Sequence, residues 1–539
     1  MQSKYIFVTG GVISSLGKGI ISSSLALLLQ SRGYKVTIQK LDPYINIDPG
    51  TLNPYEHGEC YVTYDGHESD LDLGHYERFT GIRTSKANNI TTGRIYQEVI
   101  NKERRGDYLG KTVQIIPHIT DEIKDSIKKL GTDSNYDFII TEIGGTVGDI
   151  ESTPFLEAVR QLRWELGKDA LCIHLTYVPY VKAAKELKTK PTQHSVKLLQ
   201  QTGIQPDILV LRTEIELPKS MCEKVAHFCN VSPDSVVQSI DADSIYEIPL
   251  MMHAQRLDDI VLQKTGLKSS QEPDLRLWKD FLHKLENSQD EVRIGLVGKY
   301  VELQDAYKSI SESLMHAATH LGKKLNLLYI NSEKISQSEL IEKLKSLDGV
   351  IIAPGFGKRG IEGKINALKW CRENDLPTFG ICLGMQCMVI EFARNLLGFE
   401  DADSVEMNPE TSHPVIDLME SQKKISDMGG TMRLGAYKCR LEKDSKVADA
   451  YGKTLVEERH RHRYEFNNDY LERFKEEDLK PVGFNPESEL VEVVEHANRK
   501  WYIGTQYHPE YQSTVLSPNP LFISFVKAAI DYKNDKNVE

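Results

Sequence analysis

The sequence has few cysteines, no excess of basic residues and no long hydrophobic run, and each of these features excludes a class of function. Its eight cysteines are scattered without a C-x-x-C pair, which argues against structural zinc or a disulfide framework. Lysine and arginine number 66 against 78 acidic residues, a net charge of −12, so no general polyanion-binding surface is expected. No apolar stretch is long enough to span a bilayer, and the amino terminus lacks the apolar core of a secretion signal. We therefore expect a cytoplasmic protein that binds neither nucleic acid nor membrane.

The chain of 539 residues is too long for a single hydrophobic core. Short apolar runs alternate with helix-like segments through the first half, a pattern typical of a mainly parallel sheet covered by helices on both faces. A polar, charged stretch near residue 280 indicates a partly helical linker, after which the same alternation restarts. We predict a first α/β domain over 1–267, a linker over 268–291 and a second α/β domain over 292–539.

A glycine-rich loop, GGVISSLGKGI, joins the first apolar run to a helix predicted over 18–32. Such loops turn backbone N–H groups toward phosphate oxygens, and Lys18 adds a positive charge. In the usual pattern the residue after the lysine carries a hydroxyl that holds Mg²⁺, but here it is Gly19. Asp72 and Glu142 are candidate replacements as metal ligands, with Lys40 as a further cation at the same sheet edge. The alternatives are an ordinary strand–helix turn and solvated or helix-capping carboxylates.

A second basic segment, KELKTKPTQHS, carries Lys188 and Lys190 beside Pro191. We expect the proline to interrupt a helix there, and the lysines could then hold a second triphosphate. A solvated surface loop is the alternative.

Cys382 lies in PTFGICLGMQ, between Gly380 and Gly384, a pattern that resembles the sharp turn that exposes a nucleophile at the top of a sheet. A helix amino terminus at this turn would favour the thiolate. The segment TQYHPE supplies His508 as a base and Glu510 to orient it, and we expect Pro509 to keep this backbone extended so that both side chains project to one side. Cys–His–Glu indicates acyl transfer through a thioester. A buried structural cysteine is the alternative, and it suits Cys387 better.

Together the segments FVTGGVISSLGKGI, KLDPYINIDPGTLNPYEHGE, DLDLGHYERF, EIGGTVGDIES, KTKPTQHSV, GICLGMQ, ERHRHRYEFNN and HPE resemble the CTP synthase family across essentially the whole chain. The resemblance implies an amidoligase domain with a P-loop NTPase-like, dethiobiotin-synthetase-like fold, joined to a class I glutaminase domain. It also implies the chemistry. Glutamine is hydrolysed at the cysteine, ATP phosphorylates O4 of UTP with Mg²⁺, and ammonia displaces that phosphate to give CTP. GTP as an allosteric activator, CTP as an inhibitor and a homotetramer are implied as well.

The resemblance also assigns residues to ligands by matching position. ATP would contact Ser15, Leu16, Gly17, Lys18, Gly19, Ile20, Lys40 and Asp72, with Ile240, Asp241 and Ala242 at its base, and Mg²⁺ would bind Asp72 and Glu142. UTP would contact Ser14, Lys188, Thr189, Lys190, Pro191, Thr192, Gln193 and Lys224, and inhibitory CTP would share this pocket and reach Asp149, Ile150 and Glu151. Glutamine would contact Gly355, Leu383, Gly384, Met385, Gln386, Glu406 and Arg463. His57 would line the ammonia route, and the alternative is a hydrogen-bonded histidine at an interface. Two positions depart from the family pattern, Pro354 and Ile240.

The sequence leaves two other interpretations open. One is a different amidotransferase with the same pair of domains, such as a cobyrinic acid amidating enzyme. The other is a P-loop partitioning switch or filament scaffold whose glutaminase is inactive. The segments KTKPTQ and GGTVGDIES favour the pyrimidine substrate, and the complete set of Cys382, His508 and Glu510 argues against a scaffold.

Overall fold

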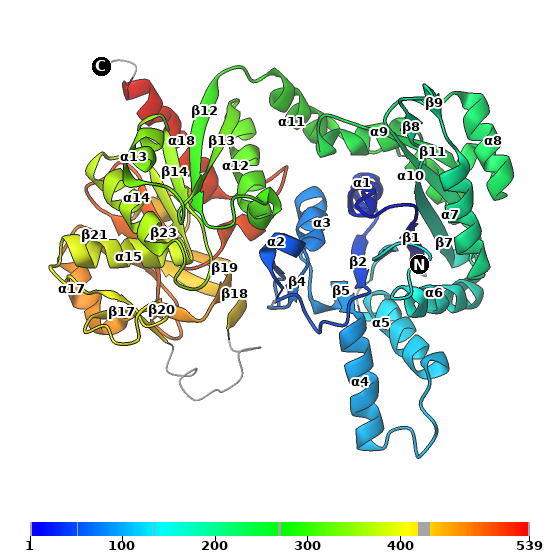
Figure 1. Ribbon diagram of the computed structural model, residues 1–539, viewed down its shortest axis with the longest axis horizontal. Helices are drawn as coiled ribbons and strands as arrows, with labels where there is room; N and C mark the ends of the chain where they lie inside the picture. Colours follow the sequence, from blue (N-terminus) through cyan, green and yellow to red (C-terminus); the bar gives the residue numbers. More distant parts are fainter. Residues whose placement is uncertain (1–2, 51, 134, 268–270, 419–431, 537–539) are drawn as a thin grey trace. The chain divides into compact units, whose positions relative to one another are not determined.

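The computed structural model describes residues 3–50, 52–133, 135–267, 271–418 and 432–536. The chain forms two compact units (Figure 1), one of Met1–Pro49 with Asp72–Leu277 and the other of Gly50–Leu71 with Trp278–Glu539. Residues 50–71, which lie inside the first domain predicted from sequence, thus fold with the second unit. The domain boundaries given above, 1–267, 268–291 and 292–539, stay a prediction.

The first unit is built on a seven-stranded parallel sheet in the order β11-β10-β7-β1-β6-β2-β5. Its strands are β1 (Lys4–Gly10), β2 (Val36–Asp42), β5 (Asn89–Thr91), β6 (Phe138–Ile143), β7 (Ala170–Tyr177), β10 (Ile208–Thr213) and β11 (Val236–Ile240). Every residue of β1, β2 and β6 is buried, as expected for central strands of a sheet that is covered on both faces. The carboxyl ends of β1, β2 and β6 therefore meet at one edge, where a ligand site is expected.

Helices of the first unit connect these parallel strands. They are α1 (Lys18–Ser31), α3 (Asp72–Thr80), α4 (Thr92–Arg105), α5 (Thr120–Asp133), α6 (Thr153–Leu166), α7 (Lys190–Gln201), α8 (Lys219–Cys229), α9 (Ile248–Ala254) and α10 (Leu257–Lys264). The helix predicted over 18–32 is confirmed, and Gly33 after it has φ +90°, a conformation that glycine adopts without steric cost. Pro191 lies in the first turn of α7, so it begins a helix rather than interrupting one.

The second unit has a nine-stranded sheet in the order β13-β12-β14-β15-β23-β22-β21-β18-β19. The first five strands are parallel and the last four antiparallel. Their bounds are β12 (Glu291–Gly298), β13 (Lys324–Asn331), β14 (Gly349–Ile352), β15 (Thr378–Ile381), β18 (Arg433–Leu441), β19 (Leu455–His462), β21 (Leu479–Phe484), β22 (Val491–His496) and β23 (Tyr502–Thr505). The predicted α/β class is confirmed in both units, with an antiparallel extension in the second.

Helices and a small sheet complete the second unit. The helices are α11 (Arg276–Asn287), α12 (Lys308–His320), α13 (Gln337–Lys345), α14 (Ile361–Glu373), α15 (Leu383–Asn395), α16 (Lys446–Tyr451), α17 (Leu471–Lys475) and α18 (Pro520–Lys536). A three-stranded sheet contains β16 (Asp403–Ser404), β17 (Pro414–Leu418) and β20 (Tyr464–Phe466). Within the predicted linker, α11 buries Trp278, Phe281 and Leu282, so this stretch packs as an amphipathic helix.

Residues 50–71 attach to the second unit through a short helix, α2 (Pro54–His57), and a hairpin of β3 (Tyr61–Val62) and β4 (Glu68–Ser69). The backbone N–H of Ala436 donates to the carbonyl of Tyr64 at 2.9 Å. The guanidinium of Arg459 donates to the Tyr61 hydroxyl at 3.0 Å and to the Val62 carbonyl at 2.9 Å. These contacts hold the segment on the strand pair β18 and β19. No helix among the described residues is long and apolar enough to cross a membrane.

Candidate functional site

The glycine-rich loop leads from the end of β1 into the first turn of α1, at the carboxyl edge of the parallel sheet. Gly17 has φ +92°, a left-handed conformation that lets the backbone turn sharply before Lys18. The Lys18 ammonium donates to the carbonyl of Gly145 at 2.6 Å. The loop therefore presents backbone N–H groups and a lysine at a helix amino terminus, the arrangement expected of a phosphate site.

A pocket next to this loop receives part of the predicted ATP set. It is lined by Ser15, Leu16, Gly17, Ile20 and Ala242 together with Arg212, Ser239, Ser244, Ile245 and Ile248. Ile240 and Asp241 do not line it, and Asp241 instead pairs with Arg212 at 2.7 Å. The apolar lining and the small Ala242 suit a planar base beside the phosphate loop.

The two carboxylates predicted as metal ligands lie together at the start of α1. Lys40 Nζ contacts Asp72 Oδ2 directly and lies 2.8 Å from Glu142 Oε1. A Cβ atom added to Gly19 would lie 3.1 Å from Asp72 Oδ1 and 3.4 Å from Glu142 Oε2. The carboxylates thus occupy the space that a hydroxyl-bearing side chain at position 19 would need. Among the described residues no cluster of three or more His, Cys, Asp or Glu side chains could hold a metal by itself. Two carboxylates suit Mg²⁺, which commonly completes its shell with phosphate and water oxygens.

The charge balance of this cluster keeps Asp72 ionised. Burial disfavours its charged form, but the adjacent Lys40 outweighs burial and lowers the pKa of Asp72 below its ordinary value. Burial likewise opposes the charge of Lys40, yet Asp72 and Glu142 raise the pKa of Lys40 well above its usual range. Asp42 lies nearby, and burial raises its pKa to about 6.

The predicted UTP and CTP residues are distributed over three segments of the first unit. Thr189, Thr192 and Gln193 are buried at the start of α7, and Gln193 Nε2 donates to Thr189 Oγ1 at 3.1 Å. This end of α7 adjoins the glycine-rich loop, because a Cβ on Gly11 would lie 1.8 Å from Ser195 Oγ. The remaining members are exposed or half-buried, and no pocket described here gathers them: Ser14, Asp149, Ile150, Glu151, Lys188, Lys190, Pro191 and Lys224. Lys188 pairs with Glu186.

Cys382 occupies a strained turn between β15 and α15, with φ 53° and ψ −104°. The flanking glycines permit this turn. A Cβ on Gly380 would meet the Gly384 backbone at 2.8 Å, and a Cβ on Gly384 would lie 2.2 Å from the Ile352 carbonyl. The predicted nucleophile turn is therefore present, with the sulfur at the amino terminus of α15.

His508 and Glu510 lie together as predicted, with Nδ1 of the imidazole 2.7 Å from Oε1 of the carboxylate. The expected reason was wrong, because Pro509 begins a 3₁₀ turn over Pro509–Gln512 rather than an extended backbone. Burial favours neutral imidazole, but Glu510 and Cys382 outweigh it and raise the pKa of His508 to about 10. This shift favours an imidazolium beside the Cys382 side chain.

Of the predicted glutamine residues, Glu406 and Leu383 lie next to the loop Ala353–Gly357, which follows β14 and contains Gly355. The N–H of Gly357 donates to Glu406 Oε1 at 2.7 Å, while the ammonium of Lys299 donates to the Phe356 carbonyl. Leu383, Gly384, Met385 and Gln386 form the first turn of α15 and are buried. Gln386 Nε2 donates to the Tyr464 carbonyl at 2.9 Å, so its amide group is already hydrogen-bonded to the protein backbone. Arg463 lies between β19 and β20.

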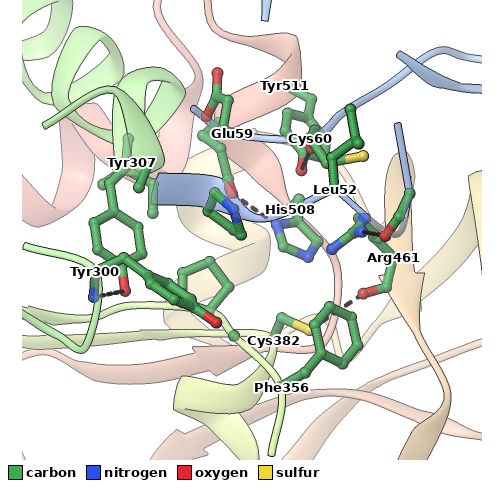
Figure 2. A pocket seen from close by; sticks show the side chains of 17 residues that line it. Leu52, Glu59, Cys60, Tyr300, Tyr307, Phe356, Cys382, Arg461, His508 and Tyr511 are labelled. Carbon is green, nitrogen blue, oxygen red and sulfur yellow. Dashed lines mark hydrogen bonds and ion pairs between the residues drawn. The ribbon is translucent and has the colours of Figure 1, made fainter. Parts of the chain in front are cut away.

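One pocket contains Cys382, His508, Glu510 and Gly355, and residues 50–60 form part of its wall (Figure 2). Gly50, Leu52, Pro54, Glu59 and Cys60 line it, whereas His57 does not. Arg461 contacts several sides of this pocket: its Nε lies 2.8 Å from Glu68 Oε1, its Nη2 donates to the Gly50 carbonyl at 3.1 Å, and its guanidinium stacks on the Phe356 ring at 5.0 Å. Leu383, Glu406 and Arg463 are not among its lining residues.

Sequence reasoning missed Arg461, Lys299, Gln506 and Lys364, which contact Cys382 or the loop Ala353–Gly357. Gln506 Nε2 donates to the sulfur of Cys382 at 3.6 Å, and it lies only two residues before His508. The sequence did contain a signal that Lys364 is buried. It follows Ile361 by three residues and precedes Leu368 by four, a spacing that places it on the apolar face of its helix.

The family profile described as CTP synthase N-terminus matches residues 4–267, and the profile described as Glutamine amidotransferase class-I matches residues 302–528. A curated CTP synthase of Bacteroides fragilis is 68% identical over 98% of this chain and 99% of its own. One of Porphyromonas gingivalis is 65% identical over 99% of both chains. The solved structure described as Trypanosoma brucei CTPS glutaminase domain with bound acivicin is 38% identical over 44% of this chain and 94% of its own, with a TM-score of 0.42. The chain thus belongs to the CTP synthase family of glutamine-hydrolysing ligases.

Proposed function

We propose that the chain aminates UTP to CTP in the cytoplasm, using ATP with Mg²⁺ in the first unit and ammonia released from glutamine in the second. The observation that carries this proposal is the position of Asp72 and Glu142 against Gly19, since two carboxylates beside a phosphate loop suit Mg²⁺-ATP. The full-length similarity to curated CTP synthases supports the choice of pyrimidine substrate.

In the synthase step, the loop Ser15–Ile20 and Lys18 would hold the phosphates of ATP, and Asp72 and Glu142 would hold Mg²⁺. The metal would neutralise charge on the transferring phosphoryl group. Lys40 forms ion pairs with both carboxylates, so it can balance their charge before the metal binds. Phosphorylation of O4 would turn a poor leaving oxygen into a good one, which ammonia then displaces. Residues 188–193 beside the loop would position UTP.

In the glutaminase step, the Cys382 sulfur would attack the amide carbon of glutamine and form a thioester. His508 would transfer a proton to the departing ammonia and then draw one from water to hydrolyse the thioester. Glu510 would hold the imidazole through Nδ1, as the 2.7 Å contact supports. Backbone N–H groups of Gly355 and of Leu383, at the start of α15, would receive the negative oxygen of the tetrahedral intermediate.

Regulation and assembly extend this proposal. We infer that GTP activates glutamine hydrolysis, that CTP inhibits by sharing the UTP site and reaching Asp149–Glu151, and that four copies form the active enzyme. Membership of the family supports these proposals.

The test is the conversion of UTP to CTP, followed by its change in ultraviolet absorbance, with ATP, Mg²⁺ and glutamine, with and without GTP. We expect CTP to form only with both nucleotides and a nitrogen donor, and faster with GTP when glutamine is that donor. Absence of CTP with either glutamine or ammonium chloride would refute the proposal. A panel of other carbonyl and carboxyl acceptors would then identify the alternative amidotransferase.

A further inference from the structure

Lys364 is a fully buried lysine that the proposed chemistry does not use. It lies in the second turn of α14, and 0% of its surface is exposed. Among the described residues it forms no ion pair with any carboxylate, and its hydrogen bond goes to the carbonyl of Ala353 at 2.6 Å. Burying a cation without an acidic partner costs free energy, and an apolar side chain of similar volume is commonly as stable or more stable there. Stability alone therefore does not account for this lysine.

The ammonium of Lys364 holds one end of the loop Ala353–Gly357. Lys299, which is also buried, donates from its ammonium to the carbonyl of Phe356 near the other end. Glu406 accepts from the N–H of the next residue, Gly357. The Ala353–Pro354 and Phe356–Gly357 peptide groups are thus held by charged side chains, and Gly355, which lies between them, lines the pocket of Cys382 with Phe356.

Lys364 also lies close to the reacting centre. A Cβ on Gly355 would be 4.0 Å from the Lys364 ammonium and 3.6 Å from a methyl of Leu383, the residue after the nucleophile. The titratable groups that interact with it are Cys387, Lys299 and Cys382. Burial makes its charge costly, and the pKa of Lys364 falls to about 8. A positive charge in a water-free region acts on nearby negative charge far more strongly than it would in solution.

We propose that Lys364 is a positioning residue for glutamine hydrolysis. Its ammonium fixes the Ala353 carbonyl, so that the N–H of Gly355 faces Cys382, and its positive charge stabilises the thiolate and the negative oxygen of the tetrahedral intermediate. This inference rests on the proposed glutaminase step. It gives a role to a residue that touches neither substrate nor nucleophile.

The variants Lys364→Met, Lys364→Gln and Lys364→Arg separate charge from hydrogen bonding in the full-length protein. Methionine has similar length without charge or donor, glutamine keeps a donor, and arginine keeps the charge. Lys369→Met, at an exposed position of the same helix, is the matched control. Ammonia-dependent CTP formation in every variant shows that the first unit is active, because this reaction does not use Cys382, and hydrogen exchange of second-unit peptides shows that the glutaminase is folded.

For Lys364→Met we expect kcat of glutamine hydrolysis to fall about tenfold or more with little change in KM, since loss of a direct oxyanion donor costs 10²–10³-fold and this effect is indirect. Iodoacetamide modification of Cys382, followed by peptide mass spectrometry, should require higher pH. We expect Lys364→Gln to lie between Lys364→Met and the wild type, and Lys364→Arg to recover part of kcat.

An unchanged kcat and an unchanged pH profile of alkylation in folded Lys364→Met would overturn the inference. A rise in KM alone would overturn it as well, because it would indicate lost binding rather than positioning. These outcomes are distinct from failure of the proposed function, in which the wild-type protein itself would neither hydrolyse glutamine nor form CTP. If Lys364→Met does not fold, Lys364→Gln and Lys364→Arg decide: equal kcat in these two variants and the wild type refutes the role.

Discussion

Gly19 lies directly against Asp72, so closely that a Cβ on the glycine would be 3.1 Å from the carboxylate oxygen Oδ1. A serine or threonine at this position, as in common phosphate loops, would add a hydroxyl where a carboxylate already stands. In the proposed assignment, the metal-ligand oxygens therefore belong to Asp72 and Glu142 and not to the loop. Substitutions of Gly19, Asp72 and Glu142 test this assignment.

Gly19→Ala should reduce ammonia-dependent CTP formation by about tenfold, because a 3.1 Å contact is too tight and the carboxylates must shift. The apparent Mg²⁺ requirement should rise in the same variant. Rates measured across a Mg²⁺ series test this, and glutamine hydrolysis in the same preparation shows that the second unit is unaffected. A normal Mg²⁺ response would show that Gly19 is not required for the position of the carboxylates.

Asp72→Asn and Glu142→Gln should each lower ammonia-dependent synthesis by at least about a hundredfold, since each removes a charged ligand of the proposed metal. Basal glutamine hydrolysis should be retained, because its residues belong to the other unit. Both activities can be measured in one preparation. Wild-type synthesis with an unaltered Mg²⁺ dependence in both variants would contradict the metal assignment.

Cys382→Ala should abolish glutamine-dependent CTP formation and leave synthesis from added ammonium chloride largely intact. Glu510→Gln should retain the nucleophile but lower glutamine hydrolysis by about 10²-fold to 10⁴-fold, because the imidazole loses the partner that orients it. Parallel assays with the two nitrogen donors make the comparison. Loss of both reactions in a folded Cys382→Ala protein would refute the division of labour.

His174 provides a pH test of the first unit. It is buried in β7, 2.9 Å from Thr9 Oγ1 through Nδ1 and 2.7 Å from Ser195 Oγ through Nε2, and burial lowers its pKa to about 3. Below pH 6.5 the unfolded imidazole binds a proton that the folded one does not, so the free energy of unfolding falls as pH falls toward 3. At pH 5 this loss is up to about 2 kcal/mol.

The measurement compares wild type with His174→Gln at pH 7.5 and pH 5, using urea unfolding reported by hydrogen exchange of first-unit peptides. The variant should lose less stability on acidification, because it lacks the titrating imidazole. An equal loss in both proteins would show that His174 does not carry this dependence.

Much of the architecture was predictable because the signals are local. The apolar runs that became β1, β2 and β6 are bounded by polar residues, and Gly33 marks the end of α1. The Cys382 turn was predictable because glycines at two fixed positions permit it. His508 and Glu510 were correctly paired, but for a wrong reason, since the 3₁₀ turn after His508 depends on packing that the spacing does not encode.

The contacts that sequence could not give are long-range ones. Arg461 meets Glu68 across 393 residues, and no local pattern links them. Lys299 and Lys364 reach the same loop from two different elements, so their convergence becomes visible only in the fold. The antiparallel strands after β23 in the sheet order were also not anticipated, because their pairing is set by tertiary packing.

Residues 50–71 have a consequence for how the two units can be separated. The backbone passes from one unit to the other three times, after Pro49, after Leu71 and after Leu277. A protease cut at the last crossing would separate residues 278–539 from the rest of the chain, and residues 50–71 would then be held to them only by non-covalent contacts. A gene truncated to begin at that point would encode a glutaminase without part of its pocket wall. Leu71 is followed immediately by Asp72, so one peptide bond joins the segment that walls the cysteine pocket to a proposed ligand of the metal.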